Sequence, residues 1–136
     1  MLTLPTEPEA VTPPRRPWHD KFKFALRGVK WGVRGHSSFS VHFFFAALVV
    51  AAAIVLQCGL LEWCVLLGCI GFVLTAELFN SAVETLFRGL DEATRERSWQ
   101  ALDISAGAVL LAGVTASLVG GLIFLNRLAI LLHFTG

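Results

Sequence analysis

The sequence predicts an all-α integral membrane protein in which an amphipathic helix at the membrane interface precedes three transmembrane helices. Hydrophobic residues make up 55% of the 136 residues, the mean hydropathy is +0.68 and only 15% of the chain is charged. These values lie outside the usual range of soluble domains. Seven of the eleven Lys and Arg residues fall before residue 35, and long runs without formal charge follow them. Residues 18–136 are therefore expected to form one small membrane domain.

The N-terminal region divides into a tail and a helix. All five prolines lie within residues 1–17, which predicts a disordered Pro-rich tail. Residues 18–34 present an aromatic and aliphatic face and, at helical spacing, a basic face. This pattern is typical of a helix lying in the membrane interface, although an ordinary surface helix with a solvated basic face would also produce it. The basic face consists of Lys23, Arg27, Lys30 and Arg34.

Three apolar segments reach the length of about 20 residues that a transmembrane helix needs. We place them at about residues 41–61, 62–87 and 101–125, with a charged connection over residues 88–100. Trp63 is suited to anchor the second segment at the interface. The third segment is rich in small residues that let helices approach closely, namely Gly107, Ala108, Ala112, Gly113, Ala116, Gly120 and Gly121.

The placement of Lys and Arg predicts the orientation of these segments. Seven precede the first segment and three lie in residues 88–100, whereas the short turn at residues 57–62 has none. Because positively charged loops remain on the cytoplasmic side, we expect the N-terminal helix and the 88–100 connection in the cytoplasm. Both regions flank the end of the second segment that contains Glu84.

A polar face interrupts the second apolar segment. Glu77, Asn80, Ser81 and Glu84 stand at positions i, i+3, i+4 and i+7, so a helix places all four on one side. Ionisable groups inside a membrane are costly and mark functional sites. Polar groups that merely hydrogen-bond helices together are the structural alternative, which one Asn or Ser would satisfy more cheaply than several carboxylates.

The depth of each group along this face indicates a different task. Glu77 lies deeper in the apolar layer and is suited to accept a proton from a lipid hydroxyl. Glu84 lies two helical turns nearer the charged connection and is suited to hold Mg²⁺, which takes one or two carboxylates plus the phosphates of its nucleotide. Asn80 can orient either carboxylate or donate to a phosphoryl oxygen. Asp103, at the start of the third segment, could meet Glu84 from a neighbouring helix.

These motifs resemble the prokaryotic diacylglycerol kinase/undecaprenol kinase family. The resemblance rests on Ala-Glu77-Leu-Phe-Asn80-Ser81-Ala-Val-Glu84, followed 19 residues after Glu84 by Asp103-Ile-Ser-Ala-Gly-Ala-Val-Leu. Residues 24–30, Phe-Ala-Leu-Arg-Gly-Val-Lys, are similar to the surface helix of that family. The resemblance covers about residues 18–132.

The resemblance implies a homotrimer in the bacterial cytoplasmic (inner) membrane that phosphorylates a lipid alcohol with MgATP at sites between subunits. It implies that Glu77 is the general base, Glu84 a metal ligand and Asn80 a positioning residue. Asp103 and Arg95 would lie at the nucleotide end and Ser81 at the lipid end. No residue separates diacylglycerol from undecaprenol as the acceptor.

Three positions depart from the family pattern. Leu102 stands where the family usually has Lys, His36 where it has a second metal-binding carboxylate, and Arg88 where it has Asp. A phosphoryl-transfer site needs positive charge near the phosphates, which Arg88, Arg95 or Lys30 could supply. Imidazole is a poor ligand for Mg²⁺, so His36 is a weak candidate.

Three functions are therefore compared. The first is a membrane lipid kinase that yields phosphatidic acid or undecaprenyl phosphate. The second is a catalytically impaired membrane homologue that binds lipid or nucleotide without turnover, motivated by Leu102 and His36. The third is an oligomeric proton or ion conductor that uses Glu77 and Asp103. The combination of Glu77, Asn80 and Glu84 favours the kinase, because a proton relay would need neither the amide nor the spacing to Asp103.

Overall fold

The computed structural model describes residues 17–35 and 37–134, and all of the regular structure in these ranges is helical. The helices are α1 (Trp18–Gly35), α2 (Ser38–Val55), α3 (Leu60–Arg88) and α4 (Glu92–Phe134). By length and composition, α2, α3 and α4 can each cross a membrane. The predicted all-α class with three apolar spans is confirmed. The predicted tail, except for Pro17, and His36 lie outside the described residues.

The main difference from the expected boundaries is the start of α4. This helix begins at Glu92 instead of about residue 101 and runs for 43 residues, or about 65 Å at 1.5 Å per residue. Asp91 explains the early start, because its carboxylate accepts hydrogen bonds from the backbone N–H of Thr94 at 3.0 Å and from the Thr94 hydroxyl at 2.7 Å. The charged residues that follow are good helix formers, so the helix continues into the apolar segment.

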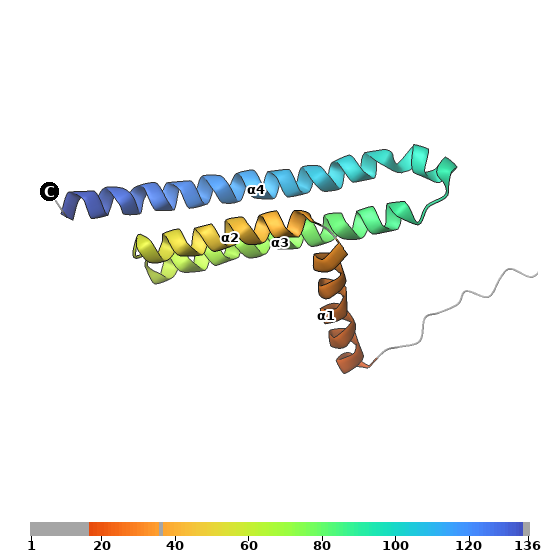
Figure 1. Ribbon diagram of the computed structural model, residues 1–136, viewed down its shortest axis with the longest axis horizontal. Coiled ribbons are helices and arrows are strands. Elements are labelled where there is room, and N and C mark those ends of the chain that lie inside the picture. Colours follow the sequence, from red (N-terminus) through yellow and green to blue (C-terminus); the bar gives the residue numbers. More distant parts are fainter. Residues whose placement is uncertain (1–16, 36, 135–136) are drawn as a thin grey trace, which may run out of the picture.

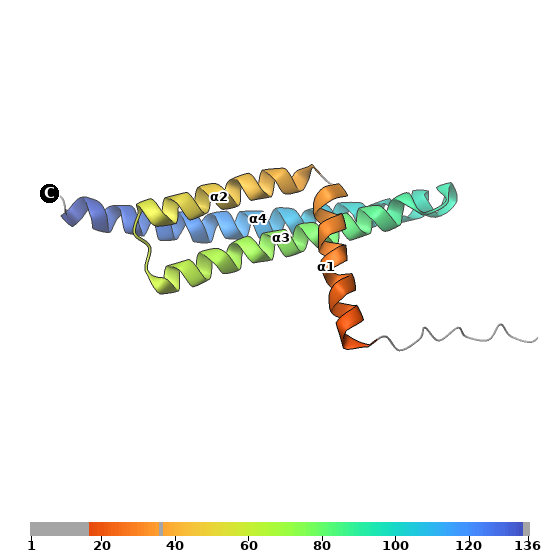
Figure 2. The ribbon, with the colours of Figure 1, turned by 60° about the horizontal axis from the view of Figure 1, so that its bottom comes forward.

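The helices form an elongated antiparallel bundle with one helix set across it. Helices α3 and α4 run side by side, and α2 lies against α3 (Figure 1). Helix α1 crosses the bundle steeply where α2 begins, and both α3 and α4 continue past it (Figure 2). We call this the α1 end; it contains α1, the beginning of α2 and the α3–α4 connection. The opposite end, which contains the turn between α2 and α3, is the turn end.

The contact between α1 and α3 depends on a glycine. A Cβ atom on Gly32 would lie 2.3 Å from Cδ1 of Leu78, so a side chain there would require the end of the Leu78 side chain to move. Leu78 directly follows Glu77 in α3. The crossing helix therefore packs closely on α3 next to the polar face.

The bundle has a small interior for its length. Phe39, Ala53, Leu66 and Ala112 are the buried hydrophobic residues of the described chain, whereas Phe43, Leu110 and many other large apolar side chains are exposed. Such an outer surface is suited to lipid or to further protein, because its side chains are apolar and the backbone polar groups along each helix are paired within the helix.

The turn end is held by a local motif and an ion pair. Gln57 adopts φ +53°, and the amides of Gln57 and Cys58 donate to the carbonyls of Ile54 and Ala53, which closes α2 in a Schellman motif. Glu62 Oε2 accepts from the amide of Gly59 at 2.6 Å and lies 2.7 Å from Nε of Arg127. Arg127 also donates to the carbonyl of Gln57. We call this arrangement the Glu62–Arg127 clamp.

Candidate active site

The polar face of α3 contains the buried polar side chains of the described residues. Glu77 is 3% exposed and Ser81 is 2% exposed, although both belong to a helix whose other buried residue is Leu66. Ser81 lines the cleft between α1 and α3, whereas Glu77 faces α2. The helix face predicted from residue spacing is therefore enclosed by other helices where it enters the apolar part of the bundle.

Two side chains of α2 meet the carboxylate of Glu77. The hydroxyl of Ser38 donates to Oε1, and Nε2 of His42 lies 3.4 Å from Oε2. Ser38 and His42 are separated by four residues in the first turns of α2, so they share one helix face. A buried carboxylate that is paired on both oxygens is held in one orientation, as a catalytic group requires.

Asn80 links Glu84, the second carboxylate of the polar face, to α4. Its Nδ2 donates to Oε1 of Glu84 at 3.0 Å, and the hydroxyl of Ser105 donates to its Oδ1 at 2.8 Å. Nη2 of Arg88 lies 3.4 Å from Oε2 of Glu84. Asn80 thus holds Glu84 in place, which agrees with the orienting task expected from its position between the carboxylates.

Next to Glu84, a polar pocket of about 290 Å³ lies between α3 and α4 and is open on one side. Glu84 of α3 and Asp103 of α4 both line it. Arg88 is the cation in its wall, and Leu102 lines it at the position where the family usually has Lys. The pocket therefore combines two carboxylates with one guanidinium. The complete lining is Asn80, Glu84, Phe87, Arg88, Leu102, Asp103 and Ala106.

The remaining candidate residues lie elsewhere. Arg95 donates to the carbonyls of Arg88 at 3.2 Å and Leu90 at 3.1 Å, so it caps the end of α3 and does not line the polar pocket. Lys30 is exposed on α1 and does not line it either. The hydroxyl of Ser81 has no hydrogen-bond partner among the described residues.

The fold brings to the polar face three residues for which no role was predicted from the sequence. They are Ser38, His42 and Ser105. Ser38 and His42 carried a weak signal, because they stand four residues apart at the start of a charge-free segment. Ser105 stood within the motif that begins at Asp103. Each contact depends on which faces of two helices meet.

The donor atoms of the polar pocket fit Mg²⁺ better than a softer metal. Glu84, Asp103 and Asn80 offer hard oxygens, which Mg²⁺ prefers. Within residues 17–35 and 37–134, no group of three or more His, Cys, Asp or Glu side chains is placed to hold a metal ion. Such a site suits an ion that takes most of its ligands from water and nucleotide phosphates.

A family model described as prokaryotic diacylglycerol kinase matches residues 23–124, which include the α1–α3 contact, the polar face and the polar pocket. The chain belongs to the prokaryotic diacylglycerol kinase family. The matched range covers α2, α3 and most of α4, so membership concerns the whole arrangement of helices around Glu77 and Glu84.

Three curated relatives support this assignment. The chain is 32% identical over 108 residues to a diacylglycerol kinase of Synechocystis sp., covering 79% of this chain and 62% of that protein. It is 29% identical over 107 residues to the undecaprenol kinase of Bacillus subtilis, covering 79% of this chain and 87% of that protein. A diacylglycerol kinase of Haemophilus influenzae is 27% identical over 103 residues, which cover 75% of this chain and 87% of the relative.

No solved structure shows a significant match to the chain. Family membership and the relatives' names indicate a membrane lipid kinase, an enzyme class that transfers phosphate from ATP. They favour this prediction over the catalytically impaired homologue. Relatives of both names match the chain at similar identity, so the comparison does not separate the two acceptors.

Proposed function

We propose that this protein transfers the γ-phosphate of ATP to the hydroxyl of a membrane lipid alcohol, either diacylglycerol or undecaprenol. The observation that carries the proposal is the separation of two carboxylates on one face of α3. Glu77 is buried beside α2, whereas Glu84 lines an open polar pocket two helical turns away. The separation of about 10 Å lets one carboxylate serve the lipid and the other the nucleotide.

At the nucleotide end, Glu84 would hold Mg²⁺, with Asn80 fixing its carboxylate and Asp103 opposite on α4. Bound magnesium neutralises charge on the phosphates during transfer. Arg88, in the wall of the pocket, supplies the positive charge. It would compensate for Leu102, which occupies the position where the family usually has Lys. Arg95 and Lys30 remain secondary candidates, because a change of side-chain rotamer would be needed to bring either cation to the pocket.

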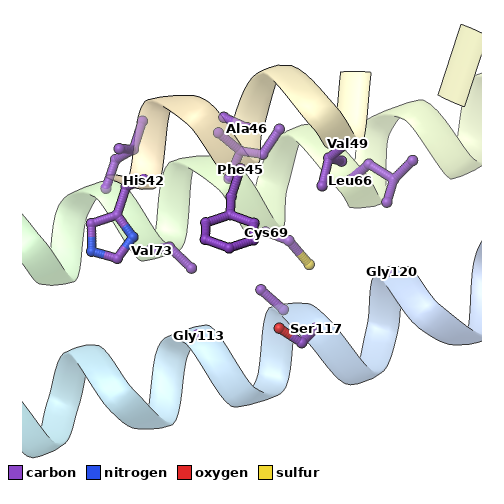
Figure 3. A pocket seen from close by; sticks show the side chains of 13 residues that line it. His42, Phe45, Ala46, Val49, Leu66, Cys69, Val73, Gly113, Ser117 and Gly120 are labelled. Atoms are coloured by element: carbon purple, nitrogen blue, oxygen red, sulfur yellow. The ribbon is translucent and has the colours of Figure 1, made fainter. Parts of the chain in front are cut away.

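At the lipid end, Glu77 is the proposed base for the acceptor hydroxyl. An apolar groove between α2, α3 and α4 begins at His42, beside Glu77, and continues to Val49 and Gly120 (Figure 3). The seven residues from His42 to Val49 correspond to about 10 Å of helix, so this groove can hold the part of a lipid chain next to its head group. The unpaired hydroxyl of Ser81 is a further proposed contact for the acceptor.

The proposed assembly is a homotrimer in the bacterial cytoplasmic membrane with its N-terminus in the cytoplasm. Positive charge before α2 and around the α3–α4 connection supports this orientation. One chain leaves the polar pocket open on one side, and Asp103 is exposed. A partner subunit would cover these groups and enclose the nucleotide.

The test is transfer of labelled γ-phosphate from MgATP to diacylglycerol and to undecaprenol in mixed micelles, with the wild type beside Glu77→Gln. Loss of a general base should lower the rate by about 10²- to 10⁴-fold. Glu62→Gln is the matched control, because it removes a carboxylate from the turn end of the same helix. If the folded wild type yields no product with either lipid, the proposed function is wrong. If Glu77→Gln retains full activity, the assignment of the base is wrong.

A further inference from the structure

The carboxylate of Glu77 is poorly accessible to an acceptor lipid. Glu77 is 3% exposed, and α2 covers it with Ser38 on Oε1 and His42 on Oε2. It does not line the apolar groove between the three long helices. A general base must come within hydrogen-bond distance of the proton that it removes, directly or through one intermediate group.

His42 occupies the position between this carboxylate and the space open to lipid. Its side chain is 22% exposed, compared with 3% for Glu77, and its Nε2 is the atom that faces Oε2 of Glu77. The ring projects from α2 toward α4 at one end of the apolar groove (Figure 3). His42 also lines a second groove on the surface of α4, bordered by Ala106, Val109 and Leu110.

We propose that His42 is a catalytic residue that relays the acceptor's proton to Glu77. The proposal rests on the proposed lipid-kinase function and deepens it, because it names the group that touches the hydroxyl. Nε2 is the ring nitrogen that faces Oε2 of Glu77, at 3.4 Å, so Nδ1 is the nitrogen available to the acceptor. The hydrogen bond made by one ring nitrogen sets the state of the other, and an N–H at Nε2 leaves a lone pair at Nδ1.

The step balances without a further reactant. As the hydroxyl oxygen forms a bond to the γ-phosphorus, the bond from that phosphorus to the bridging oxygen of ADP breaks. The hydroxyl proton passes to Nδ1, and the proton on Nε2 passes to Oε2 of Glu77. His42 remains neutral overall and Glu77 ends protonated. Ser38 holds the other oxygen, Oε1, throughout.

The surroundings of His42 leave Glu77 as its electrostatic partner. On α3, Glu77 and the thiol of Cys69 are the ionisable groups that lie against His42 or share its groove. On α4, the residues of both grooves are uncharged. Within the described residues, the imidazole therefore has its ionic contact with the carboxylate that it would serve.

The test compares His42→Ala, His42→Gln and His133→Ala in the labelled phosphate assay, each with and without added imidazole. His42→Ala opens a space beside Glu77 and should lose about 10²-fold or more in kcat. Imidazole should restore part of that activity, since it can occupy the space and carry the proton. His42→Gln can still donate to Glu77 but cannot relay a proton, so it should stay inactive. His133 is exposed at the far end of α4 and should have no effect.

The outcomes distinguish a His42 that relays the proton from a His42 that only positions Glu77. Imidazole rescue of His42→Ala together with an inactive His42→Gln supports the relay. An active His42→Gln, or His42→Ala that imidazole leaves inactive, would mean that the ring only positions Glu77. An inactive wild type overturns the proposed function itself and the relay with it, whereas an active wild type whose His42 variants behave normally overturns the relay alone.

Discussion

At the turn end Glu62 of α3 faces Arg127 of α4 across 2.7 Å, whereas at the α1 end Glu84 of α3 shares a pocket with Asp103 of α4. The first arrangement pairs opposite charges, and the amide of Gly59 and the carbonyl of Gln57 satisfy further hydrogen bonds. The second places two carboxylates near one exposed guanidinium, that of Arg88, 3.4 Å from Glu84. The same pair of helices is therefore balanced in charge at one end and negative at the other.

This difference distinguishes a structural contact from a binding site. The ion pair of the clamp is already matched in charge, so we expect it to affect stability and not ligand binding. Neighbouring carboxylates repel one another and are stabilised by a bound cation. Under the proposed function, binding of a metal ion and its nucleotide would therefore stabilise the α1 end and leave the turn end unaffected. Changes at the two ends should affect different measurements.

The largest predicted effect in this comparison is on stability at the turn end. Arg127→Leu leaves the carboxylate of Glu62 and the carbonyl of Gln57 without their partner in a partly covered site. We expect the free energy of unfolding to fall by about 1–3 kcal/mol, which lies between the values for exposed and buried ion pairs. Thermal unfolding in detergent measures it, while the KM for ATP of the folded protein should stay unchanged.

The matched control for this effect is the double variant Glu62→Leu/Arg127→Leu. It should be more stable than Arg127→Leu, because an unpaired charge costs more than an apolar pair. If the single variant is as stable as the wild type, the clamp does not contribute to folding.

Removing the guanidinium of Arg88 at the α1 end should lower activity and leave stability nearly unchanged, the reverse of the effect expected for Arg127→Leu. Arg88→Ala should lower kcat/KM for ATP by about tenfold, or about 1.4 kcal/mol, because the pocket loses its positive charge. Arg88 is largely exposed, with 69% of its side chain accessible, so thermal stability should change little. Initial rates at varied ATP concentration, beside the clamp variant Arg127→Leu, measure this separation.

Leu102→Lys tests whether positive charge in the polar pocket at the α1 end is what the activity needs. Leu102 lines the polar pocket beside Asp103, so a lysine there restores the charge that the family usually has. In the Arg88→Ala background it should recover most of the lost activity. Unchanged activity of Arg88→Ala itself would show that the phosphates are held by another cation.

Much of the fold and part of the site could be predicted from the sequence, because both depend on local patterns. Charge-free runs identify the spans, and the i, i+3, i+4, i+7 spacing places Glu77 and Glu84 on one face of α3. The part played by Ser38 and His42 could not be predicted in this way. It depends on which face of α2 packs against α3, and beyond its first turns α2 is apolar on all sides, so only the weak signal of Ser38 and His42 themselves favours a face.

Helix α4 extends beyond the predicted span 101–125 for a different reason. The predicted connection over residues 88–100 was inferred from its charge, but charge alone does not end a helix. Asp91, with Thr94 three residues later, is a helix-start signal in the sequence itself, and hydrogen bonds from both the amide and the hydroxyl of Thr94 form in the structure. Capping residues were therefore more informative than polarity for this boundary.

The smallest predicted effect concerns Asp91, a carboxylate of the α1 end that is satisfied locally, as Glu62 is at the turn end. The hydroxyl of Thr94, and then its amide, donate to Asp91 and hold the pKa of this carboxyl below its usual value. A lowered pKa stabilises the folded state above the unfolded pKa, and this contribution is lost as the pH falls through the folded value. The first turn of α4 should therefore fray below about pH 4.

Hydrogen exchange at the amides of Thr94 and Arg95, followed with pH, measures this fraying. Asp91→Asn keeps a side-chain acceptor for the Thr94 amide, so protection should persist and lose its dependence on acid pH. Asp91→Ala should exchange faster at every pH, since no side-chain acceptor remains for the Thr94 amide. Equal protection in Asp91→Ala and the wild type would show that α4 starts at Glu92 without this cap. The early start would then rest on helix propensity and on packing against α3.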